Sequence, residues 1–154
     1  NKKLVHGTCI NGFFEDIKFK NKFDIIFFYH VVEHLENPKN ILEMCKKLLN
    51  PNGLIIIAVP DCENQFTLTE SIKNPYHLWH FSKQSLENLS KTLNYSIIKI
   101  DSFSRLPKNQ RRFYKILKKL KLNLVSNFLS PFYPLTLTTN QNGYEIRLIL
   151  KNNI

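Results

Sequence analysis

The sequence has few glycines, a single methionine, a single tryptophan and no long apolar run. Its 4 glycines among 154 residues exclude collagen-like and glycine-rich low-complexity chains. The longest unbroken apolar run is Leu54–Val59, whereas a membrane-spanning helix needs about 18 residues or more. We therefore expect no transmembrane helix.

Cysteine is also scarce, and its spacing excludes two kinds of structure. Cys9, Cys45 and Cys62 are an odd number, and they form no CxxC pair or other metal-ligand spacing. No apolar segment of the kind found in signal peptides opens the chain. A disulfide framework and a cysteine-based zinc site are excluded, and we expect a protein of the reducing cytoplasm.

The composition that remains is that of a globular domain. Hydrophobic residues make up 43% and charged residues 22% of the chain, close to the globular average. A length of 154 residues suits one core, so we expect a single domain over residues 1–154. Because the chain begins with Asn1 rather than methionine, we also expect it to be an N-terminally truncated fragment.

The net charge of +10 is a local feature. Eight basic and no acidic residues lie between Arg105 and Lys121, which leaves only +2 for the rest of the chain. Apolar residues line one face of the same stretch, so residues 105–129 are expected to form a basic amphipathic helix. Three interpretations stay open: a solvated face, a peripheral contact with an anionic membrane, or a contact with a phosphorylated substrate or nucleic acid. No nucleic-acid motif accompanies the charge, so we do not expect nucleic acid as a partner.

The middle of the chain has the pattern of a strand, a helix and a second strand. Phe23–Tyr29 is a run of β-branched and aromatic residues, typical of a strand buried on both faces. Asn37 and Pro38 supply an N-cap and a first helical residue, and apolar spacing predicts a helix over Pro38–Leu49. A turn at Asn50–Gly53 precedes a second strand, Leu54–Val59. A right-handed connection would make the two strands parallel.

A polar loop, a helix and two further strands are expected after Pro60. The loop is predicted to extend to about Phe81. Ser82 can cap a helix with a leucine face, and Asn94 tolerates the left-handed conformation at its end. Strands are predicted at Tyr95–Ile100 and at Gly143–Leu150.

Several strings in this region resemble class I S-adenosylmethionine-dependent methyltransferases, especially those acting on small molecules and sugars. The strings are FDII at 23–26, VVEHLENP at 31–38, LLNPNG at 48–53, IIIAVP at 55–60 and HLWHFS at 77–82. The resemblance implies S-adenosylmethionine as cofactor and an α/β, Rossmann-like sheet with helices on both faces. It implies strands three to seven of the order 3-2-1-4-5-7-6, with a basic helical insertion at 105–139 before the last strand.

The family's glycine-rich loop and the acidic residue after its second strand have no counterpart here. Glycines occur only at positions 7, 12, 53 and 143, and none forms a GxGxG motif. About 60 or more residues are therefore expected upstream. A piece near Leu4–Ile10 would be the third strand, and Phe23–Tyr29 would then lie at a bare apolar edge.

Histidines supply the candidates for acid–base chemistry. His77 and His80 are candidate catalytic bases, because an imidazole titrates near neutral pH, and the alternative is a cluster that packs the loop. His34 is a third catalytic candidate, with helix capping or packing as its alternative. No cysteine at a suitable spacing joins His77 and His80, so we expect no metal site.

Residues at the ends of the predicted strands supply the binding candidates. Phe13 and Phe14 lie where the resemblance places the adenine of the cofactor, although both can equally be core residues. Tyr29 and His30, at the end of the first predicted strand, would meet the methionine part of the cofactor. His30 could instead contact the substrate or simply face solvent. The candidates for substrate binding are Glu33, Asp61 and Tyr76. The negative charge of Glu33 could instead stabilise the first turn of a helix.

Two functions follow from these observations. The first is methyl transfer from S-adenosylmethionine to a small-molecule acceptor, such as a sugar, a nucleotide-sugar or a lipid-linked intermediate. The alternative is a non-catalytic, methyltransferase-like module that binds a partner or an anionic membrane through residues 105–129. The oligomeric state does not follow from the sequence.

Overall fold

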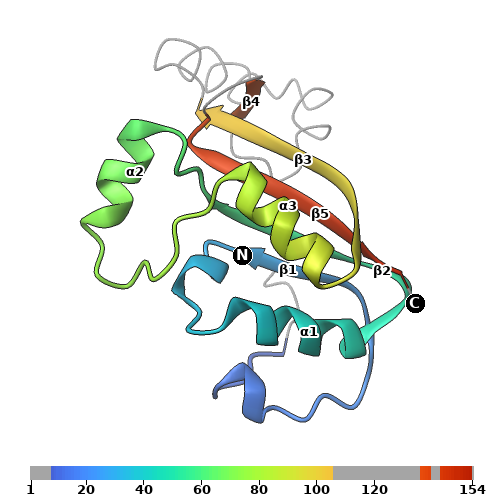
Figure 1. Ribbon diagram of the computed structural model, residues 1–154. Coiled ribbons are helices and arrows are strands. Elements are labelled where there is room, and N and C mark those ends of the chain that lie inside the picture. Colours follow the sequence, from blue (N-terminus) through green and yellow to red (C-terminus); the bar gives the residue numbers. More distant parts are fainter. Residues whose placement is uncertain (1–7, 106–135, 140–142, 154) are drawn as a thin grey trace, which may run out of the picture.

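The computed structural model describes residues 8–105, 136–139 and 143–153. Within them, one mixed sheet has the strand order β1-β2-β5-β3-β4 (Figure 1). Its strands are β1 (Phe23–Tyr29), β2 (Leu49–Pro60), β3 (Tyr95–Arg105), β4 (Thr136–Thr139) and β5 (Glu145–Asn152). The helices are α1 (Pro38–Leu48), α2 (Gln65–Ile72) and α3 (Lys83–Thr92), with short 3-10 turns η1 (Phe14–Asp16) and η2 (Val32–His34). The expected α/β class is confirmed.

The predicted strand–helix–strand unit is present. β1 and β2 pair in parallel, and α1 connects them. The Asn37 side chain accepts a hydrogen bond from the Asn40 N–H at 3.0 Å, and Pro38 is the first residue of the helix. The cap satisfies one of the backbone N–H groups that have no partner within the helix.

The predicted turn at Asn50–Gly53 is wrong, because these residues lie within β2. The register shifts here: Phe23 pairs with Leu49, and Ile25 pairs with Leu54. The extra residues form an irregularity in the strand, in which Asn52 takes a positive φ of 64°. Asparagine tolerates this conformation better than most residues. The polar residues that predicted a turn therefore form an irregular segment of β2 instead.

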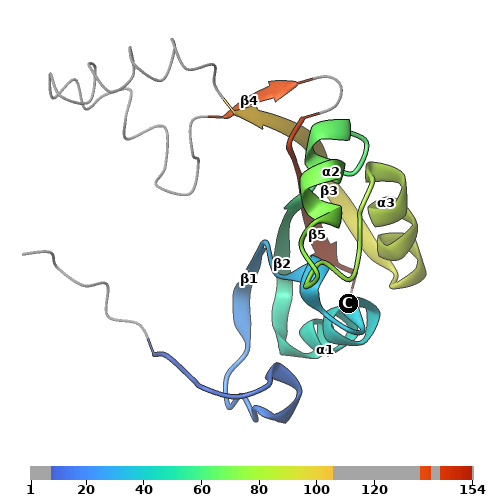
Figure 2. The same ribbon diagram turned by 90° about the vertical axis from the view of Figure 1, so that its left-hand side faces the viewer.

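The prediction that β1 is buried on both faces is also wrong. Phe28 is buried, whereas Ile25, Phe27 and Tyr29 are exposed on the alternate side. α1 and α3 pack on the same face of the sheet (Figure 2), and no α-helix covers the opposite face in the described part of the chain. Helices on both faces were expected, and the described residues have α-helices on one face.

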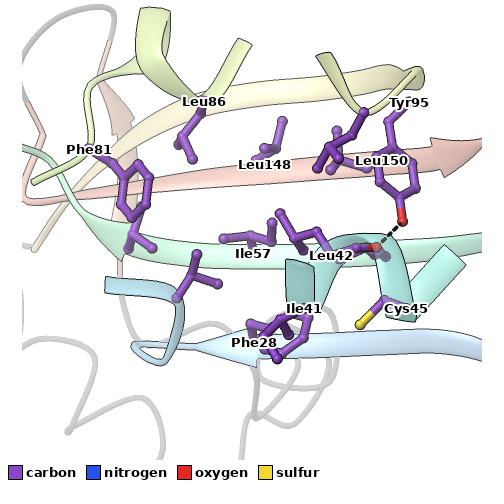
Figure 3. Packing of buried hydrophobic residues seen from close by; sticks show 14 of the residues in the cluster. Phe28, Ile41, Leu42, Cys45, Ile57, Phe81, Leu86, Tyr95, Leu148 and Leu150 are labelled. Carbon is purple, nitrogen blue, oxygen red and sulfur yellow. Dashed lines mark hydrogen bonds between the residues drawn. The ribbon is translucent and has the colours of Figure 1, made fainter. Parts of the chain in front are cut away.

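The core fills the space between the sheet and these two helices (Figure 3). Ile57 of β2, Leu148 of β5 and Leu86 of α3 are almost fully buried there. Removing such aliphatic side chains from water stabilises the fold by about 1.5–3 kcal/mol each. The Tyr95 hydroxyl reaches across the cluster and donates to the Leu42 carbonyl of α1 at 2.8 Å.

The last strand runs against its neighbours. β5 is antiparallel to both β2 and β3, and Glu145 at its start pairs with Pro60 at the end of β2. The amino-terminal end of β5 therefore lies beside the carboxyl end of β2, at the same end of the sheet as the carboxyl end of β1. This register carries Glu145 to the same end of the sheet as the candidate residues that follow β1.

The segment after Pro60 contains a helix that the sequence did not predict. α2 begins after Asn64, whose side chain accepts from the Thr67 N–H at 3.0 Å. α3 was predicted, and Ser82 caps it through a reciprocal pair of hydrogen bonds with Ser85. The predicted positive φ at Asn94 is confirmed at 52°.

Some predictions fall wholly or partly outside the described residues. The expected strand near Leu4–Ile10 is described only from residue 8, and residues 8–10 form no strand. Of the expected basic helix at 105–129, only Arg105 is described, and it ends β3. Residues 136–139 were assigned to the helical insertion but form β4, which is a correction. Among the described residues, no helix is long and apolar enough to cross a membrane.

Candidate functional site

The candidate site lies at the carboxyl ends of the parallel strands β1 and β2. Ligands of α/β sheets bind at this end, because the loops that follow the strands meet there. His30 follows β1 directly, and its backbone N–H donates to the Ala58 carbonyl of β2 at 2.9 Å. A positive φ of 51° turns the chain at His30 into η2. Such a conformation is uncommon outside glycine and marks a residue held by its surroundings.

His30 lies between two carboxylates. Its Nδ1 is 3.1 Å from Oε1 of Glu33, and its Nε2 is 3.0 Å from Oε2 of Glu145. The hydrogen bond to Glu145, followed by the one to Glu33, raises the pKa of His30 to about 9. His30 is therefore protonated at neutral pH and donates both of its N–H groups.

Glu145 is held by a second cation as well. Burial raises the pKa of the Glu145 carboxyl, but hydrogen bonds from His30 and Arg147 outweigh burial, so the pKa is lowered overall. The Arg147 side chain also lies over the Phe103 ring, 4.4 Å from its centre. Glu145 is thus an ionised group fixed from two sides, and it fixes His30 in turn.

Glu33 joins this network to the loop between α2 and α3. Its side chain is 1% exposed. Its backbone carbonyl accepts hydrogen bonds from the N–H groups of Leu78 at 2.9 Å and Trp79 at 3.1 Å. The Trp79 indole N–H donates to the Leu35 carbonyl at 2.8 Å. These bonds hold the loop against η2.

The same contacts bring His34 and His77 together. Their ring centres are 4.7 Å apart in an edge-to-face arrangement. His34 Nδ1 is 2.8 Å from the Tyr76 carbonyl oxygen, and His77 Nδ1 is 2.6 Å from Ser71 Oγ. Burial, and then the neighbouring His34, lower the pKa of His77. One ligand atom from each of Glu33, His34 and His77 lies within 4.8 Å of the others, so these three residues could hold a metal ion.

The structure places the other catalytic and loop candidates outside this cluster. His80 is exposed and takes no part in the His34–His77 contact. The Tyr76 side chain is 75% exposed, and only its backbone carbonyl reaches His34. Within the described ranges, Tyr76 therefore contributes to the site through its main chain.

The candidates for cofactor binding are Phe13 and Phe14 at η1, and Tyr29 and His30 at the end of β1. Phe13 is 77% exposed, whereas Phe14 packs against the core cluster and the Phe19 ring. The Tyr29 ring lies edge-to-face on His30, with ring centres 4.6 Å apart. Tyr29 and His30 are therefore together in the site, while Phe14 has the environment of a core residue.

The Asp61 side chain is hydrogen-bonded to other residues of the fold. Its side chain is fully buried, accepts from the Ser102 hydroxyl at 2.6 Å and accepts from the Glu63 N–H at 3.0 Å. Ser102 in turn accepts from the Gly143 N–H at 2.7 Å. One carboxylate oxygen is thus bonded to Ser102 of β3, and the other to the backbone of the loop that follows β2.

The sequence analysis missed Glu145, its partner Arg147, and Ser71. Glu145 is separated from His30 by 115 positions, and only an antiparallel last strand brings it there. Ser71 belongs to the unpredicted helix α2 and orients His77. The sequence feature that could have identified Glu145 is the presence of an acidic residue at the start of the last, apolar strand.

Comparison with known proteins supports the same fold and family. A family model for the methyltransferase domain matches residues 7–100, which is more than half of the chain. The malonyl-(acyl-carrier protein) O-methyltransferase 2 of Ilyobacter polytropus is 28% identical over 141 residues, which cover 87% of this chain and 54% of that protein. The ubiquinone biosynthesis O-methyltransferase of Glaesserella parasuis is 49% identical over 37 residues, which cover 24% of this chain and 16% of that protein.

Solved structures give the same fold at low sequence identity. A SAM-dependent methyltransferase from Archaeoglobus fulgidus matches with a TM-score of 0.58 and 17% identity, covering 85% of this chain and 60% of that one. A methyltransferase of Haloferax volcanii, in a complex with the activator Trm112, matches with a TM-score of 0.60 and 13% identity, covering 92% and 59%. The chain spans about half the length of the Ilyobacter relative. It belongs to the class I S-adenosylmethionine-dependent methyltransferase family, as its sequence motifs indicated.

Proposed function

We propose that the protein containing this chain transfers the methyl group of S-adenosylmethionine to an oxygen atom of a small acceptor that has an apolar part. The observation that carries the proposal is the charged network of His30, Glu33 and Glu145 at the open carboxyl end of the sheet. Ligands of such sheets bind at that end. The two curated relatives are both named O-methyltransferases, which favours oxygen as the acceptor atom.

The surroundings of the network suit an apolar acceptor. Leu78 and Trp79 follow His77 in the loop between α2 and α3, and their side chains are 52% and 44% exposed. Their backbones are hydrogen-bonded to Glu33, so these apolar groups are held beside the network. Of the acceptor classes that the sequence suggested, a lipid-linked intermediate therefore has more support than a free sugar or a nucleotide-sugar.

Two exposed aromatic rings, one at the end of β1 and one beside η1, are candidates to contact an adenosyl cofactor. Tyr29 presents a partly exposed ring beside His30, and the ring of Phe13 is largely exposed. Aromatic side chains suit a planar, partly apolar group such as adenine. When bound, S-adenosylmethionine supplies the methyl group, and Tyr29 and Phe13 are the residues proposed to contact it.

The residues of the network are proposed to position the reactants. His30 is protonated at neutral pH, so it serves as a hydrogen-bond donor rather than as a base. Glu145 and Glu33 fix the orientation of its ring from opposite sides. Fixed dipoles and charges lower a barrier most when they need no reorganisation during the reaction.

The test is binding of S-adenosylhomocysteine to the full-length gene product by titration calorimetry, followed by transfer of a labelled methyl group to apolar hydroxyl compounds. Glu145→Gln keeps the side-chain shape and removes its charge, and we expect methyl transfer to fall by about tenfold or more. Lys47→Ala, an exposed substitution on α1, is the matched control and should leave transfer unchanged. Absence of S-adenosylhomocysteine binding in a full-length product that carries a glycine-rich loop would contradict the proposal.

Peripheral contact with an anionic membrane stays a second proposal for the partner of this chain. It rests on the sequence of the basic stretch at 105–129, of which residues 106–129 lie outside the described residues. Binding to vesicles that contain anionic lipid, and its loss at high salt, would test it.

A further inference from the structure

We propose that Glu33, His34 and His77 form a binding site for one divalent transition-metal ion. The inference concerns metal binding alone and does not depend on the proposed methyl transfer. It rests on three features of the described residues: the mutual distances of the ligand atoms, an unpartnered carboxylate oxygen, and the hydrogen bonds that orient both imidazoles.

The ligand atoms already lie close together. One nitrogen from each histidine and one carboxylate oxygen lie within 4.8 Å of one another. In a tetrahedral site with metal–ligand bonds of about 2.0–2.1 Å, the ligand atoms are about 3.4 Å apart. The cluster is thus slightly wider than a loaded site, and small rotations of the two imidazoles would close the difference.

Glu33 supplies an independent indication of a missing ligand. Its Oε1 is paired with His30, but its Oε2 is buried and has no hydrogen-bond partner among the described residues. Leaving a buried carboxylate oxygen without a partner is costly, because the oxygen has lost its water. A cation bound by Glu33, His34 and His77 would satisfy this oxygen.

Both histidines have the hydrogen bonds that metal ligands usually carry. His34 Nδ1 meets the backbone carbonyl of Tyr76, and His77 Nδ1 meets the hydroxyl of the buried Ser71. A ligating histidine typically donates its other ring N–H to such an oxygen, which fixes the tautomer and the ring orientation. Nε2 of each ring is then the nitrogen left to bind the ion.

The outer contacts of Glu33 follow the same pattern. Its Oε1 accepts from His30, which Glu145 holds from the other side. Ligating carboxylates in metal sites are commonly fixed by hydrogen bonds of this kind. All three proposed ligands are therefore oriented by partners that are not themselves ligands.

The ligand set defines the class of ion. Two imidazoles and one carboxylate suit Zn²⁺, Fe²⁺ and Co²⁺, whereas Mg²⁺ and Ca²⁺ prefer sites made of oxygen ligands. Three protein ligands also leave at least one coordination position for water or another molecule, as in catalytic zinc sites. The ion would join η2, which carries Glu33 and His34, to the loop that carries His77.

The chain contains a built-in reporter for this site. Trp79 is its single tryptophan, and its backbone N–H is hydrogen-bonded to the Glu33 carbonyl. Titrating the tag-free, full 154-residue chain with Co²⁺ should quench Trp79 fluorescence with a stoichiometry of one. Zn²⁺ should bind in calorimetry with the same stoichiometry and displace Co²⁺, while Mg²⁺ and Ca²⁺ should have no effect.

Variants separate this site from adventitious binding. His77→Ala should weaken Zn²⁺ binding by about 100-fold, and Ser71→Ala, which removes an orienting partner, by about tenfold. His80→Ala is the matched control, because this nearby exposed histidine is outside the cluster, and it should leave the affinity within about twofold. Glu33→Gln tests the carboxylate ligand. If Glu33→Gln does not fold, the result for His77→Ala still decides the proposal.

The proposal is overturned by any of three results. The first is no stoichiometric binding of Zn²⁺ or Co²⁺ to the folded chain. The second is an affinity that His77→Ala leaves unchanged. The third is an equal loss of affinity in His80→Ala and His77→Ala, which would show surface histidines acting without a defined site.

Discussion

Asp61 illustrates how a single buried carboxylate can join segments from different parts of the chain. Its two oxygens accept hydrogen bonds from Ser102 of β3 and from the Glu63 backbone, and Ser102 also accepts from Gly143. A buried polar group must keep its partners, because water cannot replace them. The sequence suggested a substrate-binding role for Asp61, whereas its hydrogen bonds favour a role in folding.

We predict that Asp61→Ala lowers the free energy of unfolding by about 2–4 kcal/mol, because the Ser102 hydroxyl and the Glu63 N–H lose a charged acceptor. Urea unfolding followed by circular dichroism measures this change. Ser102→Ala is the companion variant, and a double-mutant cycle should give a coupling of about 1 kcal/mol or more. Additive effects of the two substitutions would contradict a direct interaction.

The cysteines differ in reactivity because their environments differ. Cys9 is exposed, whereas Cys45 is fully buried in α1, and burial raises the pKa of the Cys45 thiol to about 12. A raised pKa keeps the thiol protonated until the pH approaches that value, and only the thiolate is nucleophilic. Cys45 therefore carries almost no thiolate between pH 7 and pH 9.

We predict that iodoacetamide labels Cys9 in the folded chain and leaves Cys45 unmodified over this pH range. Labelling followed by peptide mass spectrometry measures both sites in one sample. In denaturing urea, both cysteines should be labelled, which controls for peptide recovery. Native labelling of Cys45 at the rate of Cys9 would show that α1 opens readily or packs differently.

At the scale of elements, the sequence analysis correctly predicted the helices that have a local cap and a regular apolar spacing. The Asn37–Pro38 cap and apolar spacing identify α1, and Ser82 with its leucine face identifies α3. α2 was missed because its cap, Asn64, begins a segment without a strong apolar face. The faces of β1 were misjudged because an unbroken apolar run does not show which side is covered.

The junction of β3 and β5 depends on the absence of a side chain at Gly143. A Cβ atom there would lie 2.5 Å from the nitrogen and from the oxygen of Phe103, and 2.5 Å from Ser102 Oγ. Two of these atoms are backbone, so they cannot rotate away. The start of β5, which carries Glu145 into the candidate site, is held at this contact.

We predict that Gly143→Ala destabilises the fold by about 1–3 kcal/mol, as overpacked positions do. Thermal or urea unfolding measures the loss. In a Ser102→Ala background the substitution should remain destabilising, because that change relieves only one of the three close contacts. Full recovery in that background would place the strain on the serine hydroxyl rather than on the backbone.

At the scale of the molecule, only some of the contacts in the candidate site could be predicted from the sequence. The position of His30 and Glu33 at the carboxyl end of β1 followed from the pattern of parallel strands. The meeting of His34 with His77 depends on how the loop is held by the Glu33 carbonyl, and Glu145 arrives from the far end of the chain. Such pairs depend on tertiary contacts, and no local sequence signal encodes them.

The sheet also has an apolar edge that bears on the behaviour of the whole chain. Among the described strands, β1 lies at one end of the strand order. Ile25 on this strand is 56% exposed, and it alternates along the strand with the buried Phe28. Exposed apolar side chains on such a strand can associate with the same surface of another copy of the chain.

We therefore predict that the 154-residue chain self-associates as its concentration rises, and that Ile25→Lys shifts it toward monomer. Ile72→Lys is the matched control, because Ile72 is 64% exposed but lies at the end of α2 rather than on β1. Both substitutions are at exposed positions, so both should change the free energy of unfolding by less than about 0.5 kcal/mol. Sedimentation velocity over a range of concentrations measures the association. Equal effects of the two lysines would assign the association to general charge. A chain that stays monomeric throughout would show that the exposed apolar side chains of β1 do not associate.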